Sequence, residues 1–163
     1  MPKKDVDILL LCAVPVEWEC LRALLVNASE DPSVSDPALR GRIEIGHLSW
    51  SAALVEVGMG LMAAALSTLK AVESYRPKLI LLVGIAGGIK DVDIGDVVIA
   101  DKVYPYEIGK LEGGQFQARP DTRTLPSDLV GIGRKVRAGF GSKDYRLFVG
   151  PIASGDKVIA DID

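Results

Sequence analysis

Six segments of the chain have the length and composition of β-strands. Residues 6–14 are apolar except for Asp7, and residues 79–83 are apolar throughout. Uninterrupted apolar runs are typical of strands buried on both faces, as in parallel sheets. Weaker strand patterns lie over residues 42–48, 51–57, 97–100 (extending toward residue 106) and 146–153.

Three segments between these strands carry helical patterns. Pro15 suits the first turn of a helix because its φ is fixed, and an apolar face continues from there to about Val26. Residues 61–75, rich in Ala and Leu, predict the strongest helix, which Pro77 closes. Residues 125–140 predict a third helix, weakened by two internal glycines.

The connecting segments are polar. Residues 27–39 repeat Asn, Ser, Asp and Pro and predict a surface loop, and residues 107–123 predict a long polar excursion. The sequence has no internal repeat, low-complexity tract or linker. Strands that alternate with helices indicate an α/β fold with a mostly parallel sheet, in a single domain over residues 1–163.

Composition supports a folded domain and narrows its partners. The 163 residues are 48% hydrophobic and 25% charged, which is enough to bury a core. The net charge of -3, with both signs mixed along the chain, gives no basic stripe for nucleic acid. The first apolar run is too short to cross a bilayer and has no cleavage site, so we expect a cytoplasmic protein with no membrane partner.

The cysteine and histidine content argues against a metal site. Cys12 falls in a strand pattern and Cys20 in a helical one, so we expect two buried, reduced thiols. The single histidine, His47, cannot complete a metal site with two cysteines so placed. No metal ligand is therefore predicted.

Three glycine-bearing turns follow predicted strands, at residues 58–60, 84–88 and 154–156. Ligands of open α/β sheets bind at the carboxyl ends of strands, where glycine lets the backbone approach them closely. Each turn taken alone also fits an ordinary strand-to-helix connection. None has the spacing of a dinucleotide fingerprint or a P-loop, so no cofactor is expected.

Glu17 lies one turn into the first predicted helix, at the carboxyl end of the first strand. A carboxylate in that place can orient or deprotonate a water molecule. A glutamate in a first turn also stabilises a helix through its dipole. The residues alone leave both interpretations open.

Five short motifs stand in order along the chain: Cys12–Glu17, Val57–Gly60, Val83–Gly88, Gly95–Val98 and Ser154–Asp156. In this order and spacing they resemble the nucleoside phosphorylase/uridine phosphorylase superfamily, and in particular the methylthioadenosine/S-adenosylhomocysteine nucleosidases. The resemblance covers essentially the whole chain. It implies a three-layer α/β/α fold around a mixed, mostly parallel sheet, incomplete at the C-terminus, in a homodimer or larger homo-oligomer.

The resemblance also implies an activity, the cleavage of the N-glycosidic bond of a purine nucleoside. Glu17 matches the glutamate that holds the attacking water in the nucleosidases. The glycine- and arginine-bearing phosphate loop of the phosphorylases is absent near this point, which favours water as the nucleophile. The family's ribose-binding Met-Glu pair and its Ser-Asp general acid would follow residue 163. We therefore expect a fragment of a longer protein, inactive by itself.

Five further residues are assigned to substrate binding by the resemblance. Met59 would face the ribose and its 5′ substituent. Ala86 and Gly87 would lie along the purine through their backbone. Val158 and Ile159 would contact the base, Ile159 with backbone hydrogen bonds to its edge.

Two departures from the nucleosidases bear on the substrate. Ile85 stands where they usually have a serine, and Val158 stands where an aromatic ring stacks on the base. Loss of such a stack weakens purine binding by about 1–3 kcal/mol. A phosphate-dependent nucleoside phosphorylase and a non-catalytic nucleoside-sensing module of a larger protein therefore stay open as alternatives.

Overall fold

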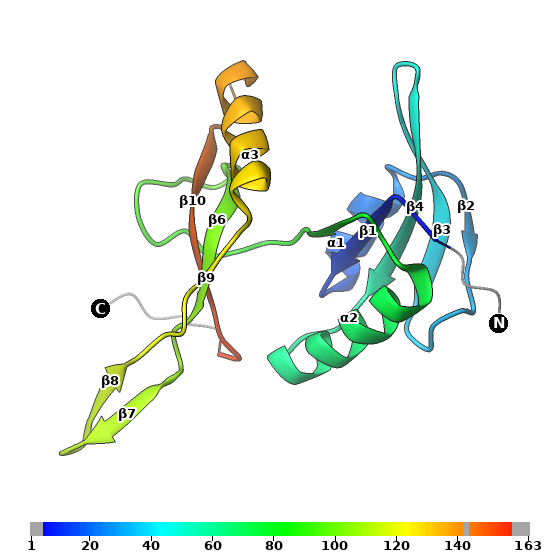
Figure 1. The fold of residues 1–163 in the computed structure, drawn as a ribbon. Coiled ribbons are helices and arrows are strands. Elements are labelled where there is room, and N and C mark those ends of the chain that lie inside the picture. The colour runs from blue at the N-terminus through cyan, green and yellow to red at the C-terminus, as the bar shows by residue number, and fades with distance from the viewer. Residues whose placement is uncertain (1–4, 142–143, 158–163) are drawn as a thin grey trace. The chain divides into compact units, whose positions relative to one another are not determined.

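The computed structural model describes residues 5–141 and 144–157 (Figure 1). The chain falls into two compact units, which divide between Ala86 and Gly87. Each unit is built on its own strands, and each is described by itself. The single domain expected over residues 1–163 stays a prediction.

The first unit contains one five-stranded sheet with the order β2-β3-β4-β1-β5. Its strands are β1 (Ile8–Cys12), β2 (Val26–Glu30), β3 (Ala38–Ile45), β4 (Leu48–Glu56) and β5 (Leu79–Leu82). β1 pairs in parallel with both β4 and β5, whereas β3 is antiparallel to both β2 and β4. The sheet is mixed, as expected, and two of the three predicted glycine-bearing turns, at residues 58–60 and 84–88, follow its strands β4 and β5.

Two helices cover this sheet. They are α1 (Pro15–Arg22) and α2 (Leu61–Tyr75). Leu9 of β1 belongs to the same core cluster as Tyr75 of α2, whereas the next residue, Leu10, belongs to a cluster with Leu21 of α1. Successive side chains of a strand point to opposite faces of a sheet. The two helices therefore cover opposite faces, which gives the first unit the three α/β/α layers that the resemblance implies.

Several predictions for the first unit are confirmed in detail. The helix over residues 61–75 forms with the predicted bounds, and Pro15 begins the first helix. That helix ends at Arg22 rather than near Val26, because Val26 already opens β2. β5 forms as predicted but lies at the edge of its sheet, with three of its four residues exposed, so it lacks the burial on both faces that β1 has.

Two predictions for this unit are wrong. The segment 27–39 is not a continuous surface loop, because β2 occupies its start and β3 begins at Ala38. β2 is exposed at every position, so an apolar pattern could not reveal it. Cys12 and Cys20 are both free, as expected, but only Cys12 is buried. Cys20 is exposed because the buried face of α1 is the one that carries Glu17 and Leu21.

The described residues of the second unit form two small sheets and one helix. Its elements are β6 (Val97–Pro105), β7 (Gly109–Glu112), β8 (Gln115–Ala118), β9 (Arg123–Thr124), α3 (Ser127–Gly139) and β10 (Leu147–Ser154). β6 is parallel to β10 and antiparallel to β9, and β7 pairs with β8 in a hairpin. The polar excursion predicted over residues 107–123 thus contains a hairpin. No helix of the described residues is long and apolar enough to span a membrane.

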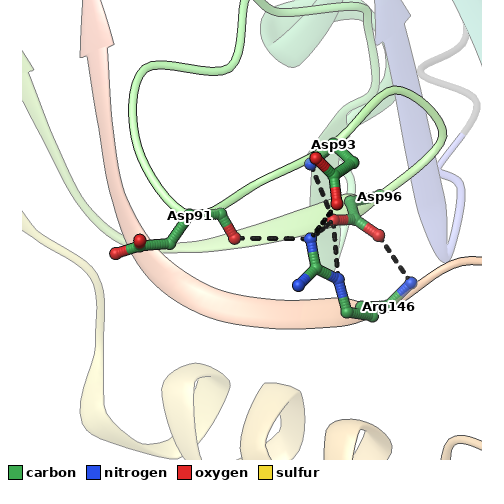
Figure 2. A network of polar contacts seen from close by, with 4 residues as sticks. All are labelled: Asp91, Asp93, Asp96 and Arg146. Carbon is green, nitrogen blue, oxygen red and sulfur yellow. Dashed lines mark hydrogen bonds and ion pairs between the residues drawn. The ribbon is translucent and has the colours of Figure 1, made fainter.

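A polar network joins the starts of β6 and β10 (Figure 2). The guanidinium of Arg146 lies 2.6 Å from Oδ2 of Asp96 and 2.8 Å from Oδ2 of Asp93, and the Arg146 N–H donates to Oδ1 of Asp96. The side chain of Asp96 is 4% exposed. Its hydrogen bonds from Arg146, followed by one from Asp93 N–H, lower its pKa to about 2. The motif at residues 95–98 is thus explained by a structural role at the amino ends of these strands.

Candidate active site

Glu17 lies at the carboxyl end of β1, where the resemblance places the nucleophilic water. β1 ends at Cys12, and the chain turns through Ala13 and Val14 before Pro15 begins α1. This places Glu17 at the third position of the helix. Its side chain is turned inward, and the residue is only 9% exposed.

Three backbone N–H groups hold the Glu17 carboxylate. Those of Ala13 and Val14 donate to Oε2 over 2.8 and 3.2 Å. The N–H of Ile85, which follows β5, donates to Oε1 over 2.8 Å. Hydrogen bonds to a charged acceptor are stronger than neutral ones. The carboxylate is thus fixed in orientation, and it ties the carboxyl end of β1 to that of β5.

The described hydrogen bonds use three of the four acceptor positions of the Glu17 carboxylate. Each carboxylate oxygen carries two lone pairs. Oε2 already accepts two N–H groups, whereas Oε1 accepts only that of Ile85. Glu17 therefore has the helix-stabilising role that its position allowed, because it accepts the N–H of Val14 at the start of α1. It also has the capacity to hold one further donor, such as water, at Oε1.

Gly84 is a site residue that sequence reasoning did not single out for this purpose. A Cβ at this position would lie 2.7 Å from Oε1 of Glu17 and 3.2 Å from its Cδ. Real Cβ atoms do not approach other atoms so closely, so the carboxylate occupies space that only glycine leaves open. The glycine-rich turn predicts a close approach of the backbone to a ligand. At Gly84 the group that lies close to the backbone is a protein carboxylate instead.

The turn after β4 lies beside this carboxylate turn. In the parallel register Cys12 of β1 is opposite Glu56 of β4, so the two strands end at the same edge. The chain then passes through Gly58 and Gly60, whose φ values of 76° and 94° favour glycine, into α2. Met59, between them, is 76% exposed. The structure thus brings Met59 and Glu17 to one edge of the sheet.

The remaining predicted residues are placed less fully. Ala86 is the last residue of the first unit and Gly87 opens the second, and both are exposed in a segment without helix or strand. Val158 and Ile159 lie outside the described residues. The turn at residues 154–156, which precedes them, is described at the end of β10.

The charged residues at this edge are both acidic: Glu17 in the turn after β1 and Glu56 at the end of β4. The turns at residues 13–17, 57–60 and 83–86 contain no lysine, arginine or histidine. A phosphate dianion needs cationic or N–H donors, and here three N–H groups already bind the carboxylate. Among the described residues no group of three His, Cys, Asp or Glu side chains is placed to hold a metal. The three turns therefore supply no cationic side chain for a phosphate.

The sequence matches the family model described as the Phosphorylase superfamily over residues 7–163. The chain belongs to the phosphorylase superfamily. It is 32% identical over 122 residues to a 5′-methylthioadenosine/S-adenosylhomocysteine nucleosidase of Chromohalobacter salexigens, with 71% of this chain and 51% of that protein covered. It is 26% identical over 161 residues to the nucleosidase of the same name from Staphylococcus haemolyticus, with 93% and 65% covered.

A solved structure agrees with these relatives. The S-adenosylhomocysteine nucleosidase from Streptococcus pyogenes, in complex with 5-methylthiotubericidin, superposes with a TM-score of 0.73 at 25% identity. The superposition covers 96% of this chain and 66% of that one. The chain thus spans about half to two thirds of the length of the relatives it matches.

Within the superfamily, the departure at Ile85 affects a side chain and spares a backbone contact. Ile85 is 77% exposed. Its backbone N–H donates to the Glu17 carboxylate. Any residue other than proline can make this backbone bond. The isoleucine therefore keeps the backbone bond that holds the Glu17 carboxylate.

Proposed function

We propose that the complete protein carrying this chain hydrolyses the N-glycosidic bond of a purine nucleoside, with Glu17 holding the attacking water. The observation that carries the proposal is the Glu17 carboxylate, which three N–H groups fix with one acceptor position left on Oε1. The nucleosidase relatives make 5′-methylthioadenosine the first substrate to test.

The chemistry needs a base on one side of the sugar and an acid on the other. A water molecule donates a hydrogen bond to Oε1, and as its oxygen bonds to C1′ of the ribose its proton passes to the Glu17 carboxylate. The bond between C1′ and the purine nitrogen breaks, and its electron pair leaves with the base. A general acid, which the resemblance implies, protonates the departing purine.

The resemblance supplies the rest of the proposed site. Met59 faces the ribose and its 5′ substituent, Ala86 and Gly87 lie along the purine, and Val158 and Ile159 bind the base. A homodimer or larger homo-oligomer in the cytoplasm completes the proposal. No metal or cofactor enters the reaction as proposed.

Adenine release from 5′-methylthioadenosine by the full-length protein tests this function. We expect release in phosphate-free buffer, with methylthioribose as the sugar product. Strict dependence on added phosphate, with a sugar 1-phosphate as product, would establish a phosphorylase instead. A protein that binds adenine but does not release adenine from 5′-methylthioadenosine would be a sensing module.

A further inference from the structure

A cavity of about 330 Å³ lies in the second unit and is lined by residues of β6, β9 and α3. Figure 1 shows where these three elements lie in that unit. The volume is at the lower end of the range of about 300–1,000 Å³ that is typical of ligand pockets, so the cavity suits a small molecule. No described residue of the first unit, to which Glu17 and Met59 belong, lines it.

The backbone of β6 brings two charged side chains to this cavity. In the register of β6 with β10, the pairing steps from Ala100 directly to Lys102, so Asp101 is an extra residue. Such a β-bulge changes the direction in which side chains point, and bulges are frequent beside functional sites. Successive residues of a regular strand point to opposite faces, whereas Asp101 and Lys102 both line the cavity.

One face of α3 supplies a third charge and part of an apolar wall. The helix packs closely against β6, because a Cβ at Gly133 would lie 3.1 Å from Cγ2 of Ile99. Val130 is 8% exposed, and Arg134 lies on the same face of the helix because it follows four residues later. Val130 and Leu125, the residue after β9, form the apolar part of the lining.

The charges that line the cavity are not paired with one another. Among the described residues the ion pairs of the second unit join other side chains, and none joins Lys102 or Arg134 to the Asp101 carboxylate. Oδ1 of Asp101 is buried and has no hydrogen-bond partner within the described part of the chain. An acceptor left in this state destabilises a protein, most of all when it is charged. The carboxylate therefore calls for a donor from a bound molecule.

We propose that this cavity binds a free α-amino acid with an apolar side chain. The ammonium group of the ligand donates to the Asp101 carboxylate, and the ligand's carboxylate accepts from Arg134 and Lys102. The apolar side chain of the ligand contacts Val130 and Leu125. Charge complementarity favours a zwitterion, because a simple anion leaves the Asp101 carboxylate uncompensated and a simple cation meets two cationic side chains.

Three ligands of matched shape test the proposal by calorimetry with the full-length protein. L-leucine carries both charges, 4-methylpentanoate lacks the ammonium group, and L-leucinamide lacks the carboxylate. Each ligand is titrated into the wild type and into the variants Asp101→Asn and Arg134→Gln. The controls are Asp128→Asn and Arg137→Gln, which alter charged residues of α3 that do not line the cavity.

We expect the wild type to bind L-leucine with a Kd below about 1 mM and to bind the other two ligands at least about tenfold more weakly, as for one lost charge-assisted hydrogen bond. Asp101→Asn should abolish the preference for L-leucine over 4-methylpentanoate, because the variant lacks the partner of the ammonium group. Arg134→Gln should reduce the preference for L-leucine over L-leucinamide. Both controls should match the wild type.

A folded wild type that binds no L-leucine at about 10 mM, or that binds the three ligands equally, would overturn the proposal. Tighter binding of 4-methylpentanoate or of inorganic phosphate than of L-leucine would also overturn it, since the cavity would then be an anion site. The same holds for ligand preferences that Asp101→Asn and Arg134→Gln leave unchanged. Adenine release measured beside the titrations tests the proposed function separately, because the residues of this cavity have no part in that reaction.

Discussion

Replacing Gly84 by alanine changes the position of the Glu17 carboxylate without altering its chemistry. The new Cβ would lie 2.7 Å from Oε1, so the carboxylate must retreat by about 0.7 Å to reach an ordinary 3.4 Å contact. Ile85 follows Gly84 in the chain, so the same movement stretches the hydrogen bond from Ile85 N–H, now 2.8 Å, beyond its usual range.

The expected loss of stability in Gly84→Ala follows from the stretched hydrogen bond of Ile85 N–H. Loss of a hydrogen bond to a charged group destabilises a protein by about 1.5–3 kcal/mol, and we expect Gly84→Ala to lower the free energy of unfolding by this amount. The rate of adenine release should fall by about 10- to 100-fold, since misplacing a reacting group by 1 Å costs about a hundredfold. Urea denaturation and the release assay measure the two effects.

A double-mutant cycle with Glu17→Gln isolates the cause. If Gly84 acts through the carboxylate, the two substitutions together should reduce the rate little more than Glu17→Gln alone. Gly139→Ala, where a Cβ meets no atom within 4 Å, should leave the rate unchanged. Wild-type stability and rate in Gly84→Ala, or rate losses that add fully in the double variant, would refute the steric reasoning.

Two further predictions concern the described units separately. Asp96→Asn should destabilise the second unit at neutral pH, because the Asp96 carboxylate accepts several hydrogen bonds from Arg146. The pKa of Asp96 is lowered from 3.8 to about 2. The stabilisation by its carboxylate is therefore complete above about pH 4 and is lost as the pH falls through 2. The free energies of unfolding of the wild type and the variant, measured by denaturation, should become equal near pH 2. Of the two thiols, Cys20 should react with a thiol reagent in the folded protein and Cys12 should not, since burial raises the pKa of Cys12 to about 11. Rapid labelling of Cys12 in native buffer would contradict its buried position.

Much of the fold could be predicted from the sequence, at those positions where local signals agree with the tertiary structure. The bounds of α2 follow from a glycine turn before Leu61 and a proline after Tyr75. The hairpin of β7 and β8 was not predicted, although the sequence carries a signal for it. Gly113-Gly114 joins the two strands, and both glycines have positive φ, at 58° and 82°. β2 offered no such signal, since an exposed edge strand carries no apolar face.

The candidate site was readable only in part. Glu17 stood out by its place after the first strand. Its third donor could not be foreseen, because Ile85 is 68 residues away and contributes a backbone N–H that its side chain does not disclose. The need for glycine at position 84 depends on the same long-range contact. Close packing between distant segments thus decided what the local pattern left open.

The claim that Glu17 holds the attacking water is tested most directly by comparing two glutamate-to-glutamine substitutions on the same helix. Glu17→Gln keeps the size of the side chain but removes the base, whereas Glu19→Gln alters an exposed residue of the same helix. In phosphate-free buffer, Glu17→Gln should release adenine from 5′-methylthioadenosine at least about 100-fold more slowly than the wild type, and Glu19→Gln at the wild-type rate. A folded Glu17→Gln protein that keeps the wild-type rate would contradict the account.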